Sequence, residues 1–138
     1  MSTIPESSLL EKRGQDHETI FIVDDERLML HLLEKVLTRH GYQVLTACDG
    51  EQAIDVYRSY KPRIDAVLLD VGLPRSTGWQ VLLKLKEEKP DVRVVIASGY
   101  LEPKMKAEMS GAGVKHFVNK PYKLNELLQT IQGLLRSS

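Results

Sequence analysis

The chain has 138 residues, of which 42% are hydrophobic and 28% charged, as is typical of one globular domain with a buried core. Its 19 basic side chains balance its 19 acidic ones, so no strong net field would draw it to nucleic acid or to an anionic membrane. A single cysteine, Cys48, excludes an intrachain disulfide, and neither a membrane span nor a signal segment is apparent. We therefore expect a cytoplasmic protein.

Residues 1–17 are mostly polar and lack a sustained hydrophobic period, which predicts a flexible tail or linker ahead of one domain at 18–138. The domain begins with a continuous apolar run, 20–23, typical of a strand buried on both faces. Leu28, Leu32 and Val36 then recur at helical spacing until Gly41, which predicts the first helix and its end.

The same alternation of strand and helix repeats along the rest of the chain. We expect further strands at 42–46, 66–69, 92–97 and 116–118, and helices at 50–59, 78–88, 103–110 and around 124–131. Asp49 is predicted to cap the second helix, Ser76 or Thr77 the third, and Pro103 suits the first turn of the fourth. Five alternations with short loops predict an α/β fold, with a parallel sheet and helices on both faces.

Polar residues follow four of the predicted strands. In chain order they are Asp24-Asp25-Glu26, Asp70, Ser98 and Asn119-Lys120-Pro121. Each group alone has an ordinary interpretation as a turn, a helix cap or a solvated charge. Ligands of open parallel sheets bind at the carboxyl ends of the strands, however, so all four groups converge on one edge. Their convergence favours a functional site over four independent surface loops.

The residue types at this edge indicate phosphoryl chemistry. Clustered carboxylates repel one another unless a cation joins them, and oxygen ligands favour Mg²⁺, or Mn²⁺ as an alternative. A carboxylate beside such a cation can act as a nucleophile toward phosphorus. The lysine and the serine hydroxyl would then stabilise the charge on the transferred group.

These motifs together resemble the receiver domains of two-component response regulators, over roughly Glu18 to Leu135. The resemblance rests on four segments: Val23-Asp24-Asp25-Glu26, Leu69-Asp70-Val71-Gly72-Leu73-Pro74 with Gly78, Ala97-Ser98-Gly99-Tyr100, and Asn119-Lys120-Pro121. It implies a flavodoxin-like (βα)5 fold with strand order 2-1-3-4-5. It also implies a phosphorylation-activated signalling switch rather than an enzyme, although such a domain assists its own phosphorylation and autodephosphorylation.

The resemblance implies a role for each site residue. Asp70 would accept a phosphoryl group from a phosphohistidine on a sensor histidine kinase or a histidine phosphotransfer domain. Asp24, Asp25, Asp70 and the backbone carbonyl of Gly72 would bind the metal ion. The phosphoryl group itself would contact Ser98 and Lys120, and a cis peptide bond would precede Pro121.

The resemblance also implies how the signal leaves the site. Ser98 would move toward the phosphoryl group and Phe117 would turn into the space it leaves. The partner surface, for a downstream protein or a homodimer, would be helix 103–110, strand 116–118 and the last helix. Its expected members include Met105, Met109, Lys115 and Tyr122. Tyr100 and Gly72 flank the acceptor, where Tyr100 would shield the phosphoryl group.

Several alternatives remain at this stage. A phosphatase with an aspartate nucleophile needs a second acid two residues later, where this chain has Gly72. The chain lacks the hydroxyl- and glycine-rich phosphate loop that a flavin site needs, and it has no Gly-x-x-x-x-Gly-Lys nucleotide loop. A receiver that only docks partners stays open. The choice between a stand-alone receiver and the receiver of a hybrid kinase also stays open. The run at 14–20, with Ser98-Gly99-Tyr100, favours the hybrid-kinase receiver.

Overall fold

A computed structural model describes residues 18–72 and 78–136 of the chain. The predicted tail at 1–17 and the predicted capping residues Ser76 and Thr77 lie outside the described residues. Every other element expected from the sequence is present; most ends of the strands and helices shift by at most two residues, and the last helix extends to Arg136.

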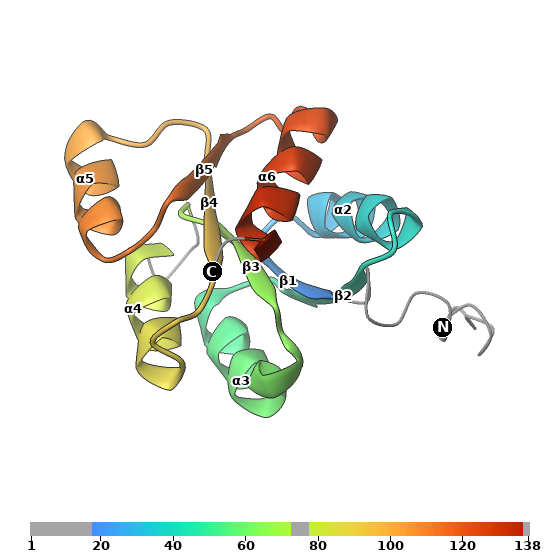
Figure 1. Ribbon diagram of the computed structural model, residues 1–138, viewed down its shortest axis with the longest axis horizontal. Helices are drawn as coiled ribbons and strands as arrows, with labels where there is room; N and C mark the ends of the chain where they lie inside the picture. The colour runs from blue at the N-terminus through green and yellow to red at the C-terminus, as the bar shows by residue number, and fades with distance from the viewer. Residues whose placement is uncertain (1–17, 73–77, 137–138) are drawn as a thin grey trace.

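The centre of the molecule is a five-stranded parallel sheet (Figure 1). Its strands are β1 (Thr19–Val23), β2 (Gln43–Ala47), β3 (Ala66–Asp70), β4 (Val94–Ser98) and β5 (His116–Asn119). Their order is β2-β1-β3-β4-β5, which confirms the expected flavodoxin-like arrangement. The chain passes from β1 outward to β2 and then back across to β3, so the strand order reverses between β1 and β3.

Helices cover both faces of this sheet. They are α2 (Arg27–Arg39), α3 (Gly50–Tyr60), α4 (Gly78–Glu88), α5 (Pro103–Gly111) and α6 (Leu124–Arg136), with a short 3₁₀ turn, η1 (Lys61–Arg63). Figure 1 shows α2 and α6 on one face, and α3, α4 and α5 on the other. Within the described part of the chain, no helix combines the length and the apolar character needed to cross a membrane.

Two hydrophobic cores lie between the sheet and these two helical layers. Phe21 and Val23 of β1 belong to the core under α3, α4 and α5. Ile20 and Ile22 belong to the core under α2 and α6. All five residues of β1 are buried, because successive side chains point to opposite faces and both faces are covered. This burial explains the continuous apolar run in the sequence.

Helix α2 buries a different stripe from the one that its sequence pattern suggested. The expected stripe began with Leu28 and Leu32, but these side chains are 83% and 54% exposed. The helix instead buries Leu30, Leu33 and Leu37. Both sets recur at helical spacing, and the angle at which the helix packs on the sheet selects between them.

The prediction for one surface residue is also wrong. Met109, expected on a partner surface, is fully buried in the core under α5. Two predicted helix signals are confirmed: the Asp49 side chain accepts a hydrogen bond from the Gln52 amide at 2.7 Å, and Gly41 ends α2 with φ 93°.

Candidate functional site

Three carboxylates meet at the carboxyl edge of the sheet. Asp70 ends β3, and Asp24 and Asp25 directly follow β1. The two strands are hydrogen-bonded neighbours with Val23 opposite Leu69, which places Asp24 beside Asp70. One oxygen from each of the three side chains lies within 4.8 Å of the others. The convergence predicted for these residues is therefore present.

Asp24 is the most deeply buried member of the cluster. It is 0% exposed, Asp70 is 6% exposed, and Asp25 faces solvent. Burial raises the pKa of Asp24, although a hydrogen bond from the Glu26 amide at 2.9 Å and the nearby Lys120 ammonium oppose this shift. The site thus holds a carboxylate in a place that disfavours its charge.

Lys120 supplies the positive charge of the cluster. Its Nζ atom lies 3.1 Å from Asp24 Oδ2, 3.3 Å from Asp70 Oδ2 and 3.3 Å from Glu26 Oε1. Burial alone would lower the pKa of Lys120, but the carboxylates of Asp24 and Asp70 outweigh burial and raise it. The peptide bond between Lys120 and Pro121 is cis, as predicted.

Two contacts of Lys120 were not predicted. Glu26 was noted only as part of an acidic run, yet its side chain pairs with the ammonium group. Tyr122, expected on a partner surface, packs against the core under α2 and α6 with its ring centroid 5.9 Å from Lys120 Nζ. The contact with Glu26 joins residues 94 positions apart, which no local spacing signals. Tyr122 follows Lys120 by two residues, but the packing of its ring depends on the fold.

Among the residues that the structure describes, the Ser98 side chain forms hydrogen bonds with Tyr100 and not with the carboxylates. Its hydroxyl donates to the Tyr100 carbonyl oxygen at 2.7 Å and accepts from the Tyr100 amide at 3.1 Å. The side chain is 7% exposed and follows Ala97, which pairs with Asp70 across the sheet. Ser98 therefore lies next to the site while its hydrogen bonds remain within its own loop.

Gly72 contacts the site through its backbone. Its amide donates to Asp70 Oδ1 at 3.0 Å, and a Cβ added at Gly72 would lie 3.6 Å from the same oxygen, an ordinary contact. The glycine thus orients Asp70 without being sterically required. Its carbonyl as a metal ligand stays a prediction.

The donor set fits a small hard cation. The Lys120 ammonium pairs with Asp24, Glu26 and Asp70, and Asp25 adds a further carboxylate to the cluster, which leaves an excess of negative charge. Clustered carboxylate oxygens, here on two buried side chains and one that faces solvent, are the ligands that Mg²⁺ uses while keeping some of its water. The cluster is therefore compatible with Mg²⁺.

The fold and this edge define the class of protein: a doubly wound α/β domain whose switch point carries acids, a hydroxyl and a lysine. The chain belongs to the response regulator receiver domain family, whose model matches residues 20–132. Receiver domains are the phosphoacceptor modules of two-component signalling.

Curated relatives support this assignment. Sporulation initiation phosphotransferase F of Bacillus subtilis is 33% identical over 119 residues, which cover 86% of this chain and 94% of that protein. Response regulator MprA of Mycolicibacterium vanbaalenii is 34% identical over 117 residues, which cover 85% of this chain but 50% of that protein. The chain thus spans about half the length of several curated relatives that it matches.

Solved structures show the same fold. The Borrelia burgdorferi CheX–CheY–BeF₃–Mg²⁺ complex contains a chain with a TM-score of 0.82 and 28% identity, covering 87% of this chain and 90% of that one. Response regulator TrrA of Thermotoga maritima, in complex with Mg²⁺–BeF, has a TM-score of 0.75 and 28% identity, covering 86% and 99%.

Proposed function

We propose that the protein is a phosphorylation-activated switch in a two-component phosphorelay and that Asp70 accepts the phosphoryl group from a phosphohistidine. One observation carries this proposal: Asp70 lies within 4.8 Å of Asp24 and Asp25 and within 3.3 Å of the Lys120 ammonium. A nucleophilic carboxylate, a metal-binding acid pair and a phosphate-binding cation are the parts that this transfer needs.

The transfer breaks the N–P bond of the phosphohistidine and forms an O–P bond to an Asp70 carboxylate oxygen. Lys120 already contacts Asp70 Oδ2, so its ammonium can remain beside the oxygens of the transferred group. Ser98 would exchange its bond to the Tyr100 carbonyl for one to the phosphoryl group. These side chains bind and orient the group, while the transferred phosphoryl arrives from the partner.

Asp24, Asp25, Asp70 and the Gly72 carbonyl would hold Mg²⁺, or Mn²⁺ with the same oxygen ligands. The ion supplies neutralisation of the negative charge that gathers on the phosphoryl oxygens. The same groups would assist autodephosphorylation, with water as the acceptor. We therefore assign the chain as a self-assisting phosphoacceptor rather than an enzyme with a separate substrate.

Exposed leucines beside the site support a docking surface for the phosphodonor, either a sensor histidine kinase or a histidine phosphotransfer domain. Leu28, which follows Glu26 by two residues, is 83% exposed, and Leu32 lies one turn further along α2. Leu124, at the start of α6 on the same sheet face, is 44% exposed. Exposed apolar side chains on helices that follow β1 and β5, the strands that lead into Asp24 and Lys120, suit a helix that presents a phosphohistidine.

The output surface in this proposal is formed by α5, β5 and α6. Phe117 on β5 would respond to phosphorylation, and exposed Lys115 with partly exposed Met105 would contact a downstream protein or a second copy in a homodimer. The proposal places the domain in the cytoplasm, without direct contact to nucleic acid or membrane. It holds for a stand-alone receiver and for the receiver of a hybrid histidine kinase.

Phosphorylation by acetyl phosphate and Mg²⁺ tests the proposal. We expect intact-protein mass spectrometry to show one added phosphoryl group that is stable in acid and labile in base. Asp70→Asn should abolish the adduct, because an amide is a far weaker nucleophile. Asp55→Asn makes the same change on an exposed site of α3 and should leave the adduct intact. An adduct that persists in Asp70→Asn would falsify the assignment.

A further inference from the structure

Helix α5 is held to the domain by few buried side chains. Of its residues, Met109 alone is fully buried, and its first residue, Pro103, follows an N-cap, Glu102, that makes no side-chain hydrogen bond. By comparison, α6 buries Leu127, Leu128, Ile131 and Leu134. An element with so little buried apolar surface lies at the low end of local stability, so one added contact can change its preferred position.

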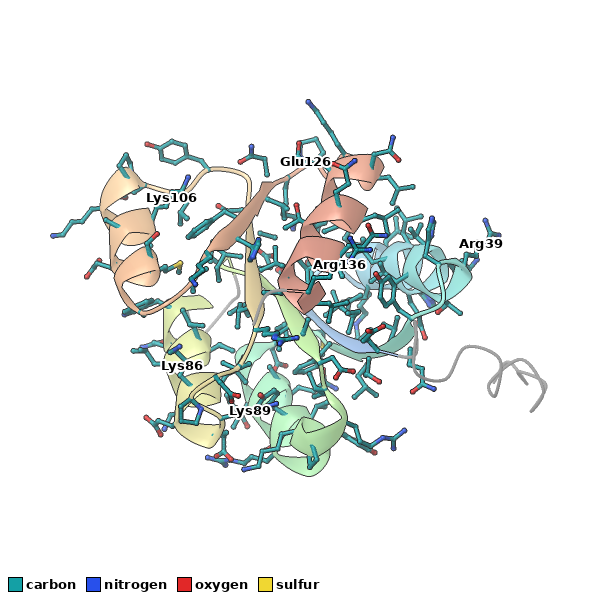
Figure 2. All side chains as sticks on the ribbon, viewed as in Figure 1. Arg39, Lys86, Lys89, Lys106, Glu126 and Arg136 are labelled. Carbon is teal, nitrogen blue, oxygen red and sulfur yellow. The ribbon has the colours of Figure 1, made fainter. Side chains whose placement is uncertain are left out.

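Lys106 provides such a contact. Its ammonium group lies over the ring of Phe117 on β5, 5.1 Å from the ring centroid. Figure 2 shows Lys106 on the side of α5 that faces β5. This cation–π contact joins the loosely held helix to the residue whose ring is expected to move on phosphorylation.

Phe117 and Ser98 lie on the same face of the sheet. Phe117 pairs with Ile96 across β4 and β5, and Ser98 follows Ile96 by two residues on the same face. Ser98 is bonded to Tyr100 rather than to Asp70 in this structure, and Phe117 is only partly buried. The contact with Lys106 therefore belongs to the conformation in which Ser98 has not moved toward Asp70.

We propose that Lys106 is a latch that holds the Phe117 ring in the partly buried position that it has here, against turning further inward, and so sets the resting balance of the switch. This inference rests on the proposed function of Asp70. A ligand that needs the inward ring must break the contact, because the ammonium cannot follow the ring into the core without losing its water. The latch therefore lowers the apparent affinity of the site for phosphoryl-like ligands.

Lys106→Gln removes the cation and keeps most of the side-chain length. We expect its apparent affinity for Mg²⁺ with beryllofluoride to rise about two- to five-fold, the equivalent of an exposed cation–π contact of about 0.5–1 kcal/mol. Loss of a positive charge near an anion site would by itself weaken anion binding, so the sign of the effect separates the latch from simple electrostatics. Lys106→Arg should stay near the wild-type affinity.

The ring itself can be observed by ¹⁹F NMR. The chain has 2 phenylalanines, Phe21 and Phe117, so labelling with 4-fluorophenylalanine gives two signals, which Phe117→Leu assigns. Without any ligand, Lys106→Gln should move the Phe117 signal toward its position in the beryllofluoride complex and leave the signal of buried Phe21 in place. An unchanged Phe117 signal would overturn the latch, whatever Asp70 does.

Two controls complete the experiment. Lys104→Gln removes a charge from the same helix and should not raise the affinity. In a Phe117→Leu background, Lys106→Gln should have no further effect; an equal rise there would overturn the latch, because the lysine would then act without the ring. If the Asp70→Asn variant binds beryllofluoride as well as wild type does, the proposed function is contradicted instead. This variant therefore separates a failure of the proposed function from a failure of the latch.

Discussion

Tyr57 carries a hydroxyl group that is buried without a hydrogen-bond partner among the described residues. Its ring is 0% exposed and stacks on Phe21 with 6.5 Å between ring centroids. Burial, with added repulsion from Asp91 and Glu88, raises the pKa of Tyr57 to about 12, so the hydroxyl stays protonated at neutral pH. A buried donor without a partner costs about 1–3 kcal/mol.

Tyr57→Phe should therefore raise the free energy of unfolding by about 1 kcal/mol, because it removes the unpaired hydroxyl and keeps the stacked ring. Urea denaturation followed by circular dichroism measures the change. Tyr60→Phe removes a hydroxyl from a side chain that is 41% exposed, and should change stability by less than about 0.5 kcal/mol. A Tyr57→Phe variant less stable than wild type would mean that the hydroxyl has a partner.

At the scale of single elements, α2 shows how one helix serves two surfaces. Its buried stripe of Leu30, Leu33 and Leu37 anchors it to the sheet, while Leu28 and Leu32 stay exposed beside the acidic edge. An exposed pair of apolar side chains adds little to the stability of the fold and lowers the solubility of the protein. Such a pair therefore indicates a binding surface. Phosphodonor docking is the use that we propose for it.

Leu28→Ser combined with Leu32→Ser should slow phosphoryl transfer from a phosphorylated histidine phosphotransfer protein by about tenfold or more, as loss of anchor side chains does at interfaces. Phosphorylation by acetyl phosphate should be unaffected, because this small donor needs no docking surface. Radiolabel transfer assays measure both rates. Leu83→Ser on α4, where the side chain is 41% exposed, is the matched control. Equal slowing with both donors would argue against docking on α2.

At the scale of the whole molecule, the buried carboxylate at the acidic edge lowers the free energy of unfolding at neutral pH. Burial raises the pKa of Asp24 above its ordinary value of 3.8, so the folded state holds this proton more tightly than the unfolded state. The stability linked to that proton is complete below about pH 4 and is lost as the pH rises through the folded pKa. At neutral pH the folded protein carries the cost of an ionised, buried Asp24, partly offset by Lys120.

Asp24→Asn should thus be more stable than wild type by about 1 kcal/mol at pH 7 without Mg²⁺, and the difference should shrink as the pH falls toward 4. Mg²⁺ at ten times its dissociation constant should stabilise wild type by about 1.4 kcal/mol and the variant by less. Thermal denaturation at several pH values, with and without Mg²⁺, measures both effects. Asp55→Asn should leave the response to Mg²⁺ unchanged. A difference that grows on acidification would contradict this account.

Much of the architecture was predictable because its signals are local. A continuous apolar run such as 20–23 marks a strand covered on both faces, and Asp49 and Gly41 mark helix ends through contacts within a few residues. The face that α2 buries was not predictable, since its two apolar stripes have the same period. Only packing against the sheet distinguishes them.

The candidate site divides in the same way. By itself, the sequence determined that Asp24, Asp25, Asp70 and Lys120 share one edge, because parallel strands bring their carboxyl ends together. The pairing of Lys120 with Glu26 and the position of the Lys106 ammonium over the Phe117 ring were decided by tertiary structure alone. Those contacts depend on side-chain rotamers and on packing between different elements, neither of which leaves a periodic trace in the chain.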